Sequence, residues 1–116
     1  MKYIFIPVVG PILYISLPDG KVPSFEKFKD IISAKSLEVV HCHTNYRHLM
    51  LIDECGKICD PPKEVNFRAF ALYGGFPNDL IVGDVILGKE GYTPEGVDIV
   101  GFNDDEVKEY VRFFCE

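Results

Sequence analysis

Short runs of β-branched and aromatic residues, each ended by glycine, proline or polar turn residues, constrain the fold of this chain most strongly. The runs cover residues 3–9, 12–17, 37–43, 47–53, 79–89 and 97–102. They have the length of strands, and a turn at Gly10 and Pro11 separates the first two. The pattern therefore predicts a sheet that is mostly antiparallel.

Two other segments follow the period of a helix. Ser24, a preferred N-cap residue, precedes apolar residues at helical spacing, namely Phe25, Phe28, Ile31 and Ile32. Asn103 and Glu106 have the spacing of a capping box, and the stripe behind them comprises Val107, Tyr110, Val111 and Phe114. Because each segment has one apolar stripe, we expect helices over residues 24–34 and 104–114 on the same side of the sheet.

The segment KEVNFRAFALYGG, residues 63–75, fits two structures. Its polar start and the stop at Gly74 and Gly75 suit a short helix, whereas its aromatic content suits an extended segment. The short helix is the interpretation we favour. The elements together predict one α+β domain over residues 1–116, with a mostly antiparallel sheet covered on one face by two helices.

Charge is distributed unevenly along the chain. The net charge is −6, and residues 76–116 carry ten acidic but only three basic side chains. We therefore expect no non-specific binding to nucleic acid. Pro7 would break the helical core of a signal peptide, and no apolar run has the length of a membrane span. These features predict a protein of the cytosol, where its four cysteines stay reduced, without membrane partners.

One stretch, HCHTNYRHLM, holds every histidine and is predicted to form a hairpin. A turn at residues 44–45 would place His41 across from His48, and a turn at residues 45–46 would place His43 there instead. In both registers the three imidazoles share one face. A three-residue loop would separate His48 from the other two, because side chains alternate along a strand.

The sequence favours neither a metal site nor an active site. Clustered histidines can bind zinc, and Cys55 and Cys59 have an acceptable ligand spacing. The two groups lie roughly 20 Å apart at about 3.3 Å per residue, so we predict no metal and no other cofactor. A cysteine and a histidine could form a catalytic pair. Since no segment offers a nucleophile elbow or a phosphate-cradling loop, we predict that the protein is not an enzyme.

The histidine hairpin is our candidate for a small anion site. The imidazoles of His41, His43 and His48 would surround the ligand, Tyr46 would stack on it, and Arg47 or Arg68 would pair with a phosphate. The alternative is that these residues are the solvated polar face of a hairpin.

The central and C-terminal stretches resemble a family of small uncharacterised proteins encoded by bacteriophages and other mobile elements. The resemblance covers residues 37–112 and rests on LEVVHCH, on LMLIDECGKICDPPKEVNFRAF, on DLIVGDVILGK and on GFNDDEVKEY. The family shows a DExGK turn, a PPN segment followed by a basic residue and alanine, an IxGD strand and a closing TDEE-like helix. Here Cys55 replaces a turn asparagine and Lys63 replaces the asparagine of PPN. The run from Asn66 to Ala69 matches the family's asparagine, basic residue and alanine. Asn66 is therefore a candidate binding residue together with Arg68.

The resemblance implies an accessory protein that acts in the cytosol of an infected bacterium. We expect a sponge, meaning a homo-oligomeric protein that sequesters a small nucleotide-like signal made by a host defence system. An alternative is an inhibitor that occludes a host defence protein with its acidic C-terminal region. A further alternative is a structural or interaction protein with no ligand.

Overall fold

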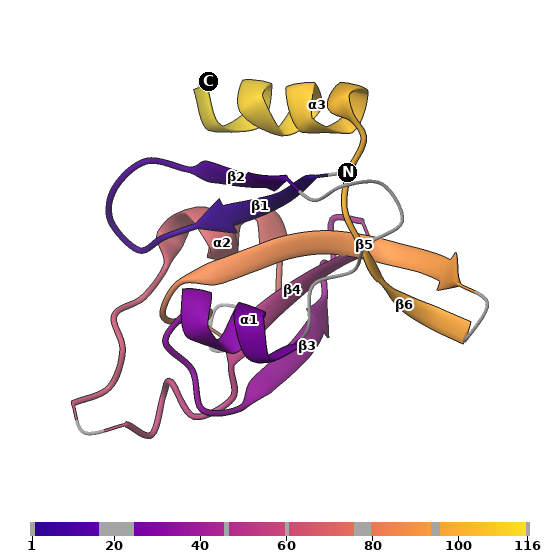
Figure 1. The fold of residues 1–116 in the computed structure, drawn as a ribbon. Helices are drawn as coiled ribbons and strands as arrows, with labels where there is room; N and C mark the ends of the chain where they lie inside the picture. Colours follow the sequence, from indigo (N-terminus) through magenta and orange to yellow (C-terminus); the bar gives the residue numbers. More distant parts are fainter. Residues whose placement is uncertain are drawn as a thin grey trace.

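The computed structural model describes residues 2–16, 25–45, 47–59, 61–75, 80–93 and 96–115 (Figure 1). The strands are β1 (Lys2–Ile6), β2 (Leu13–Ser16), β3 (Leu37–His41), β4 (His48–Asp53), β5 (Val85–Thr93) and β6 (Gly96–Val100). The helices are α1 (Phe25–Ile31), α2 (Phe67–Tyr73) and α3 (Asp104–Cys115). No helix in the described ranges is long and apolar enough to cross a lipid bilayer.

The strands form one sheet in the order β2-β1-β5-β4-β3, and every neighbouring pair is antiparallel. β5 is the central and longest strand. β1 pairs with residues 85–87 of β5, and β6 pairs with residues 89–93 on the same side. A bridge between Lys2 and Phe102 joins these two shorter strands end to end. The predicted α+β class and antiparallel sheet are confirmed.

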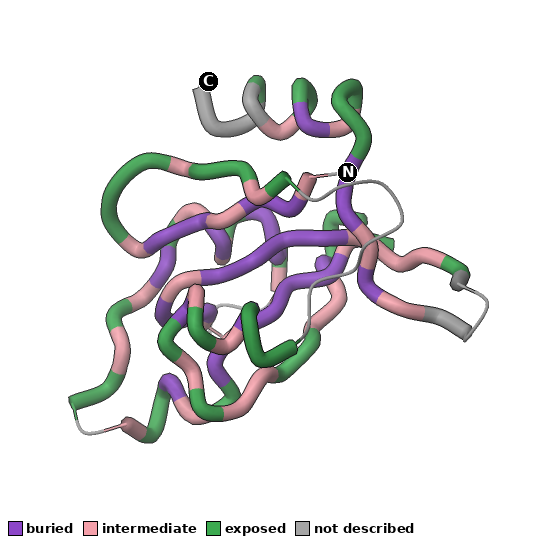
Figure 2. Tube along the Cα trace, in the orientation of Figure 1, coloured by how far each residue is buried: buried purple, intermediate pink, exposed green. Residues whose placement is uncertain are grey.

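Helices cover both faces of this sheet. On the face that we call the α2/α3 face, Leu72 of α2 and Val107 of α3 pack with sheet residues that include Ile4, Met50 and Leu87. On the opposite face, the α1 face, Phe28 and Ile32 pack with Tyr3, Leu49, Leu51 and Ile86. Figure 2 shows the buried positions along the central strands.

The prediction that the helices at residues 24–34 and 104–114 lie on the same side is therefore wrong. The two helices that do share a face are α2 and α3. The central strands are buried on both sides, because the consecutive residues Val85, Ile86 and Leu87, whose side chains alternate between the two faces, are all buried. Either face of the sheet could therefore accept the apolar stripe of a helix.

The short helix expected within residues 63–75 is confirmed as α2. Asn66 caps it, because its Oδ1 accepts a hydrogen bond from the backbone N–H of Ala69 at 3.0 Å. Gly74 ends it in the left-handed conformation at φ 67°, which glycine adopts without the steric penalty of a side chain.

The predicted capping box of α3 is also confirmed. The N–H of Glu106 donates to Asn103 Oδ1 at 2.9 Å, and the N–H of Asn103 donates to Glu106 Oε1 at 3.0 Å. Ser24, the proposed cap of α1, lies outside the described residues, as do the side chains of Val111 and Phe114.

Candidate functional site

The β3–β4 hairpin has a register that separates its histidines. Val40 pairs with Met50, His41 pairs with Leu49, and the N–H of Cys42 donates to His48 O at 2.9 Å. This corresponds to a loop of odd length, so neither two-residue turn forms. The prediction that the three imidazoles share one face is wrong, because His48 lies opposite Cys42 while His41 lies opposite Leu49.

Each histidine has its own surroundings. His48 lies on the α2/α3 face, with its ring centroid 5.1 Å from that of Phe102 and 5.5 Å from that of Tyr110. His41 lines a shallow groove on the α1 face. His43 is exposed, and its ring centroid lies 5.1 Å from that of Tyr73. The backbone N–H of His43 donates to Tyr73 O at 2.7 Å. The three imidazoles therefore lie in three different places, and that of His48 joins a cluster of polar side chains that includes Asn45 and Tyr110.

The hydrogen bonds of His48 fix which ring nitrogen carries the proton. Asn45 Oδ1 accepts the N–H of Arg47 at 3.1 Å, so the Nδ2 of that amide faces His48 Nε2 at 3.2 Å. Because an amide nitrogen only donates, Nε2 accepts. Nδ1 then carries the hydrogen of the neutral ring and donates to the hydroxyl oxygen of Tyr110. Protonation of His48 would place a hydrogen on Nε2, and this N–H would then face the Nδ2 donor of Asn45.

Burial, more than the charges around it, favours the neutral form of the His48 ring. Burial lowers the pKa of His48, and this effect and the nearby Lys89 and Arg47 outweigh the opposing effect of Glu106. Burial alone would raise the pKa of Glu106, but hydrogen bonds from Lys89 and from the backbone of Asn103 lower it. Lys89 Nζ lies 2.6 Å from Glu106 Oε1. A neutral imidazole thus lies beside an ion pair.

Two cavities meet at this cluster. One, of about 410 Å³, lies between the hairpin loop, α2 and α3, and its lining includes Thr44, Leu72, Glu109 and Tyr110. The other, of about 580 Å³, runs along β5 and its lining includes Arg47, Lys89 and Tyr92. Both are lined by Asn45, His48 and Glu106. We call the combined surface the His48 groove. Each cavity has the volume of a typical small-molecule site, roughly 300–1,000 Å³.

The other predicted site residues are distributed over the molecule. Arg47 is exposed and lines the His48 groove. Arg68 Nη2 donates to Pro7 O at 2.6 Å, which fixes this arginine to the end of β1. Tyr46 lies outside the described residues. Of the candidate set, the structure brings Arg47 and His48 together in one groove.

Asn66 has a structural role instead. It is fully buried, and its Nδ2 donates to Ile6 O and to Gly83 O, each at 2.9 Å, while its Oδ1 caps α2. Its amide therefore joins α2, β1 and the turn before β5, and no part of it faces a ligand.

The groove contains residues that our sequence analysis did not select. Lys89 and Tyr92 come from β5, and Glu106, Glu109 and Tyr110 come from α3. Tyr92 is 85% exposed, which is unusual for a large aromatic side chain. The order of apolar and polar residues around it in the sequence does not indicate this exposure. Tyr110 was assigned to a buried stripe. The one signal in the sequence that Tyr110 could lie beside a polar group was its position one helical turn after Glu106.

Cysteine chemistry is disfavoured at this site. Cys42 is buried, and burial raises the pKa of its thiol to about 11, so the reactive thiolate is scarce at neutral pH. Cys59 Sγ donates to Cys55 O at 3.0 Å within the turn after β4. Within the described part of the chain, no three His, Cys, Asp or Glu side chains lie close enough together to hold a metal ion.

Comparison of the chain with protein-family models, with curated proteins and with solved structures found no match.

Proposed function

We propose that this protein is a non-catalytic binding protein that holds a small nucleotide-like molecule in the His48 groove. In the context of the resemblance above, the molecule is a signal made by a bacterial defence system, and the protein acts as a sponge in the host cytosol. The observation that carries the proposal is that an exposed arginine and an exposed aromatic ring, Arg47 and Tyr92, line one cavity.

These two side chains suit the two parts of a nucleotide. The guanidinium of Arg47 can pair with phosphate oxygens through two parallel hydrogen bonds. Tyr92 offers a flat ring on which a base can stack. Lys89 is already paired with Glu106, so Arg47 supplies most of the positive charge for the phosphate.

The other end of the groove suits the polar edge of a base. Glu109 and Tyr110 line it together with Thr44, whose hydroxyl donates to Leu72 O at 2.6 Å and is therefore held in place. A carboxylate there can accept hydrogen bonds from an exocyclic amino group. The groove thus offers a cationic end along β5 and an acceptor-rich end at α3.

The ionisation of nearby groups supports holding rather than converting the ligand. Burial raises the pKa of Tyr110 and of Cys42, so neither is an anionic nucleophile at neutral pH. Both ring nitrogens of His48 are engaged by side chains of the protein, which leaves the imidazole poorly placed as a general base.

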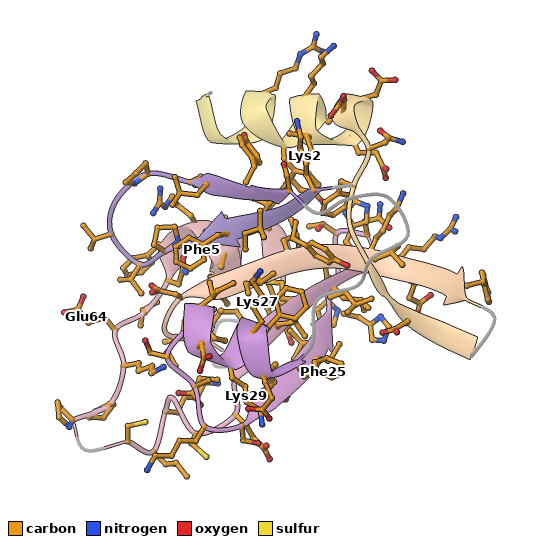
Figure 3. The ribbon with its side chains drawn as sticks, viewed as in Figure 1. Lys2, Phe5, Phe25, Lys27, Lys29 and Glu64 are labelled. Atoms are coloured by element: carbon orange, nitrogen blue, oxygen red, sulfur yellow. The ribbon has the colours of Figure 1, made fainter. Side chains whose placement is uncertain are left out.

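A second candidate function is inhibition of a defence protein by the acidic first turn of α3. Asp104, Asp105 and Glu106 occupy that turn. Asp104 pairs with Lys2 at 3.2 Å and Glu106 pairs with Lys89, so much of the negative charge is neutralised within the chain. Figure 3 labels Lys2 beside α3. This neutralisation makes the acidic turn a weaker mimic of nucleic acid and favours the groove.

The test is a thermal-shift screen with cyclic dinucleotides, cyclic ADP-ribose isomers and NAD derivatives. A compound present at a hundred times its dissociation constant should add about 2.7 kcal/mol of stability. Calorimetry with that compound should show at least tenfold weaker binding for Arg47→Ala and for Tyr92→Ala. Arg112→Ala, which removes an exposed cation in the last turn of α3, is the matched control and should bind normally.

Chromatography of the ligand after incubation separates sequestration from turnover, since a sponge returns the compound unchanged. The proposal is overturned if no compound stabilises the protein, or if Arg47→Ala binds as tightly as the unaltered chain. Failure of the screen together with capture of a host nuclease would favour the inhibitor.

A further inference from the structure

The outer edge of β3 is a second surface with the features of a binding site. β3 is the last strand in the sheet order, and within the described ranges it pairs with β4 alone (Figure 1). The N–H of Cys42 bonds to His48 O, and hydrogen-bonded pairs alternate along antiparallel strands. Val40 therefore bonds to Met50 across the pair, whereas the backbone N–H and C=O of Val39 point away from β4.

An apolar groove runs beside this edge on the α1 face. Its volume is about 220 Å³, and Phe25, Val39, Leu49 and Ile99 supply its apolar lining. Phe25 is 51% exposed and Val39 is 46% exposed, although both belong to regular elements. Figure 3 labels Phe25 at the start of α1. A strand added to β3 would hydrogen-bond to Val39 and place alternate side chains over this groove.

The charge beside this edge selects the kind of strand that fits. The side chain of Glu38 is exposed on the face of β3 opposite Val39, and none of the described residues that line the groove is lysine or arginine. The whole chain carries a net charge of −6. A partner that brings lysine or arginine beside apolar side chains would be attracted here. A second copy of this chain would bring more negative charge to the same place.

We propose that the β3 edge binds an extended segment of a partner protein in which apolar and basic residues alternate. The segment adds to the sheet as a strand next to β3. Its apolar side chains cover Phe25 and Val39 on the α1 face, and its basic side chains, which point to the other face, pair with Glu38 of β3. None of Phe25, Val39 and Glu38 lines the His48 groove, so this surface and the ligand site proposed there can fail independently.

The test uses labelled peptides of about eight residues, the length of a long strand. One alternates valine with lysine, a second alternates valine with glutamate, and a third alternates threonine with lysine. Fluorescence anisotropy should show that the valine-lysine peptide binds at least tenfold more tightly than either of the others. If the threonine-lysine peptide bound as tightly as the valine-lysine peptide, charge alone would account for binding, and this result would overturn the proposal.

Val39→Pro is the variant that isolates strand addition. Proline removes an N–H that β4 does not use, and proline is tolerated on edge strands. Val39→Ala loses the valine side chain but keeps the N–H, which makes it the matched control. Val39→Pro should abolish binding of the valine-lysine peptide, Val39→Ala should weaken it less, and Glu38→Gln should weaken it about threefold.

Hydrogen exchange in the unaltered chain provides a readout that does not depend on a folded proline variant. The valine-lysine peptide should slow exchange of the Val39 amide and leave that of Val40 unchanged, because β4 already protects Val40. Binding that leaves the Val39 amide unprotected would contradict strand addition. A dimer that Val39→Pro converts to a monomer would identify a second copy as the occupant and overturn the proposal.

Discussion

The hydroxyl of Tyr110 and Nδ1 of His48 are hydrogen-bonded, which joins α3 to the first residue of β4 across 62 positions of sequence. The ion pair between Lys89 and Glu106 and the buried side chain of Val107 hold the same helix on the sheet. The docking of α3 therefore depends on a neutral imidazole, and this dependence can be measured.

Stability should fall as the pH drops below about 6.5, the ordinary pKa of histidine. The pKa of His48 is lowered in the folded protein, so the unfolded chain binds a proton first and unfolding is favoured as the pH falls from that value through the folded pKa. Above pH 6.5 the contribution of His48 is constant. Melting temperatures between pH 5 and 8 should show this slope, which His48→Gln should flatten. An unaltered slope in that variant would assign it to another group.

Tyr110→Phe should destabilise the protein by about 1 kcal/mol, the usual net contribution of one hydrogen bond. The ring contacts with His48 and Phe102 remain, but the proton on His48 Nδ1 loses its acceptor. Urea denaturation measures the loss. Tyr14→Phe is the control, because Tyr14 is exposed on β2 and its substitution should change the free energy of unfolding little. Equal effects of the two substitutions would rule out a role for the buried hydroxyl.

Asn66→Ala should cost about 3 kcal/mol or more. The substitution removes the cap of α2 and leaves the carbonyl groups of Ile6 and Gly83 without their buried donor. Asn103→Ala removes only the exposed cap of α3 and should cost about 1 kcal/mol. Chemical denaturation of the two variants side by side gives the comparison, and a similar loss for both would contradict a central role for Asn66.

Lys63→Ala should destabilise the protein by about 2 kcal/mol, since it leaves a buried carboxylate without its cation. Lys63 Nζ lies 2.8 Å from Asp53 Oδ2 and also donates to Ile32 O and Ser33 O. Because the lysine side chain is 23% exposed, the effect is smaller than the 3–5 kcal/mol of a fully buried pair. Lys29→Ala breaks the more exposed pair with Glu26 and should cost about 0.5 kcal/mol or less. Thermal unfolding compares them, and a neutral Lys63→Ala would show that solvent reaches Asp53.

Local signals in the sequence identified most of the elements. Asn103 with Glu106, and Gly74 after the apolar run of α2, are caps whose hydrogen bonds involve neighbouring residues, so spacing alone predicts them. The strand expected over residues 79–89 starts later than its apolar pattern indicates, and Gly83 is the reason. It adopts φ 77° in the turn before β5, and the strand begins at Val85.

The location of the groove could not be predicted in the same way. The side of the sheet on which His48 lies depends on whether the hairpin loop has an odd or even number of residues, and the sequence fits both. Tyr92 lines the same cavity as His48 because β5 pairs with β4, and Tyr110 contacts His48 because α3 covers that face. Long-range contacts of this kind leave no periodic trace in the sequence.

The end-to-end placement of β1 and β6 on β5 has a consequence for folding kinetics. β1 and β2 can form a hairpin early, but Ile4 meets its partner in β5 only at Leu87, and Lys2 meets Phe102. During synthesis on the ribosome, the centre of the sheet therefore stays open until β5 has emerged. Such non-local pairing slows folding relative to a helical domain of this size. Until then the edge of β1 that pairs with β5 stays unpaired, and unpaired strand edges are prone to aggregation.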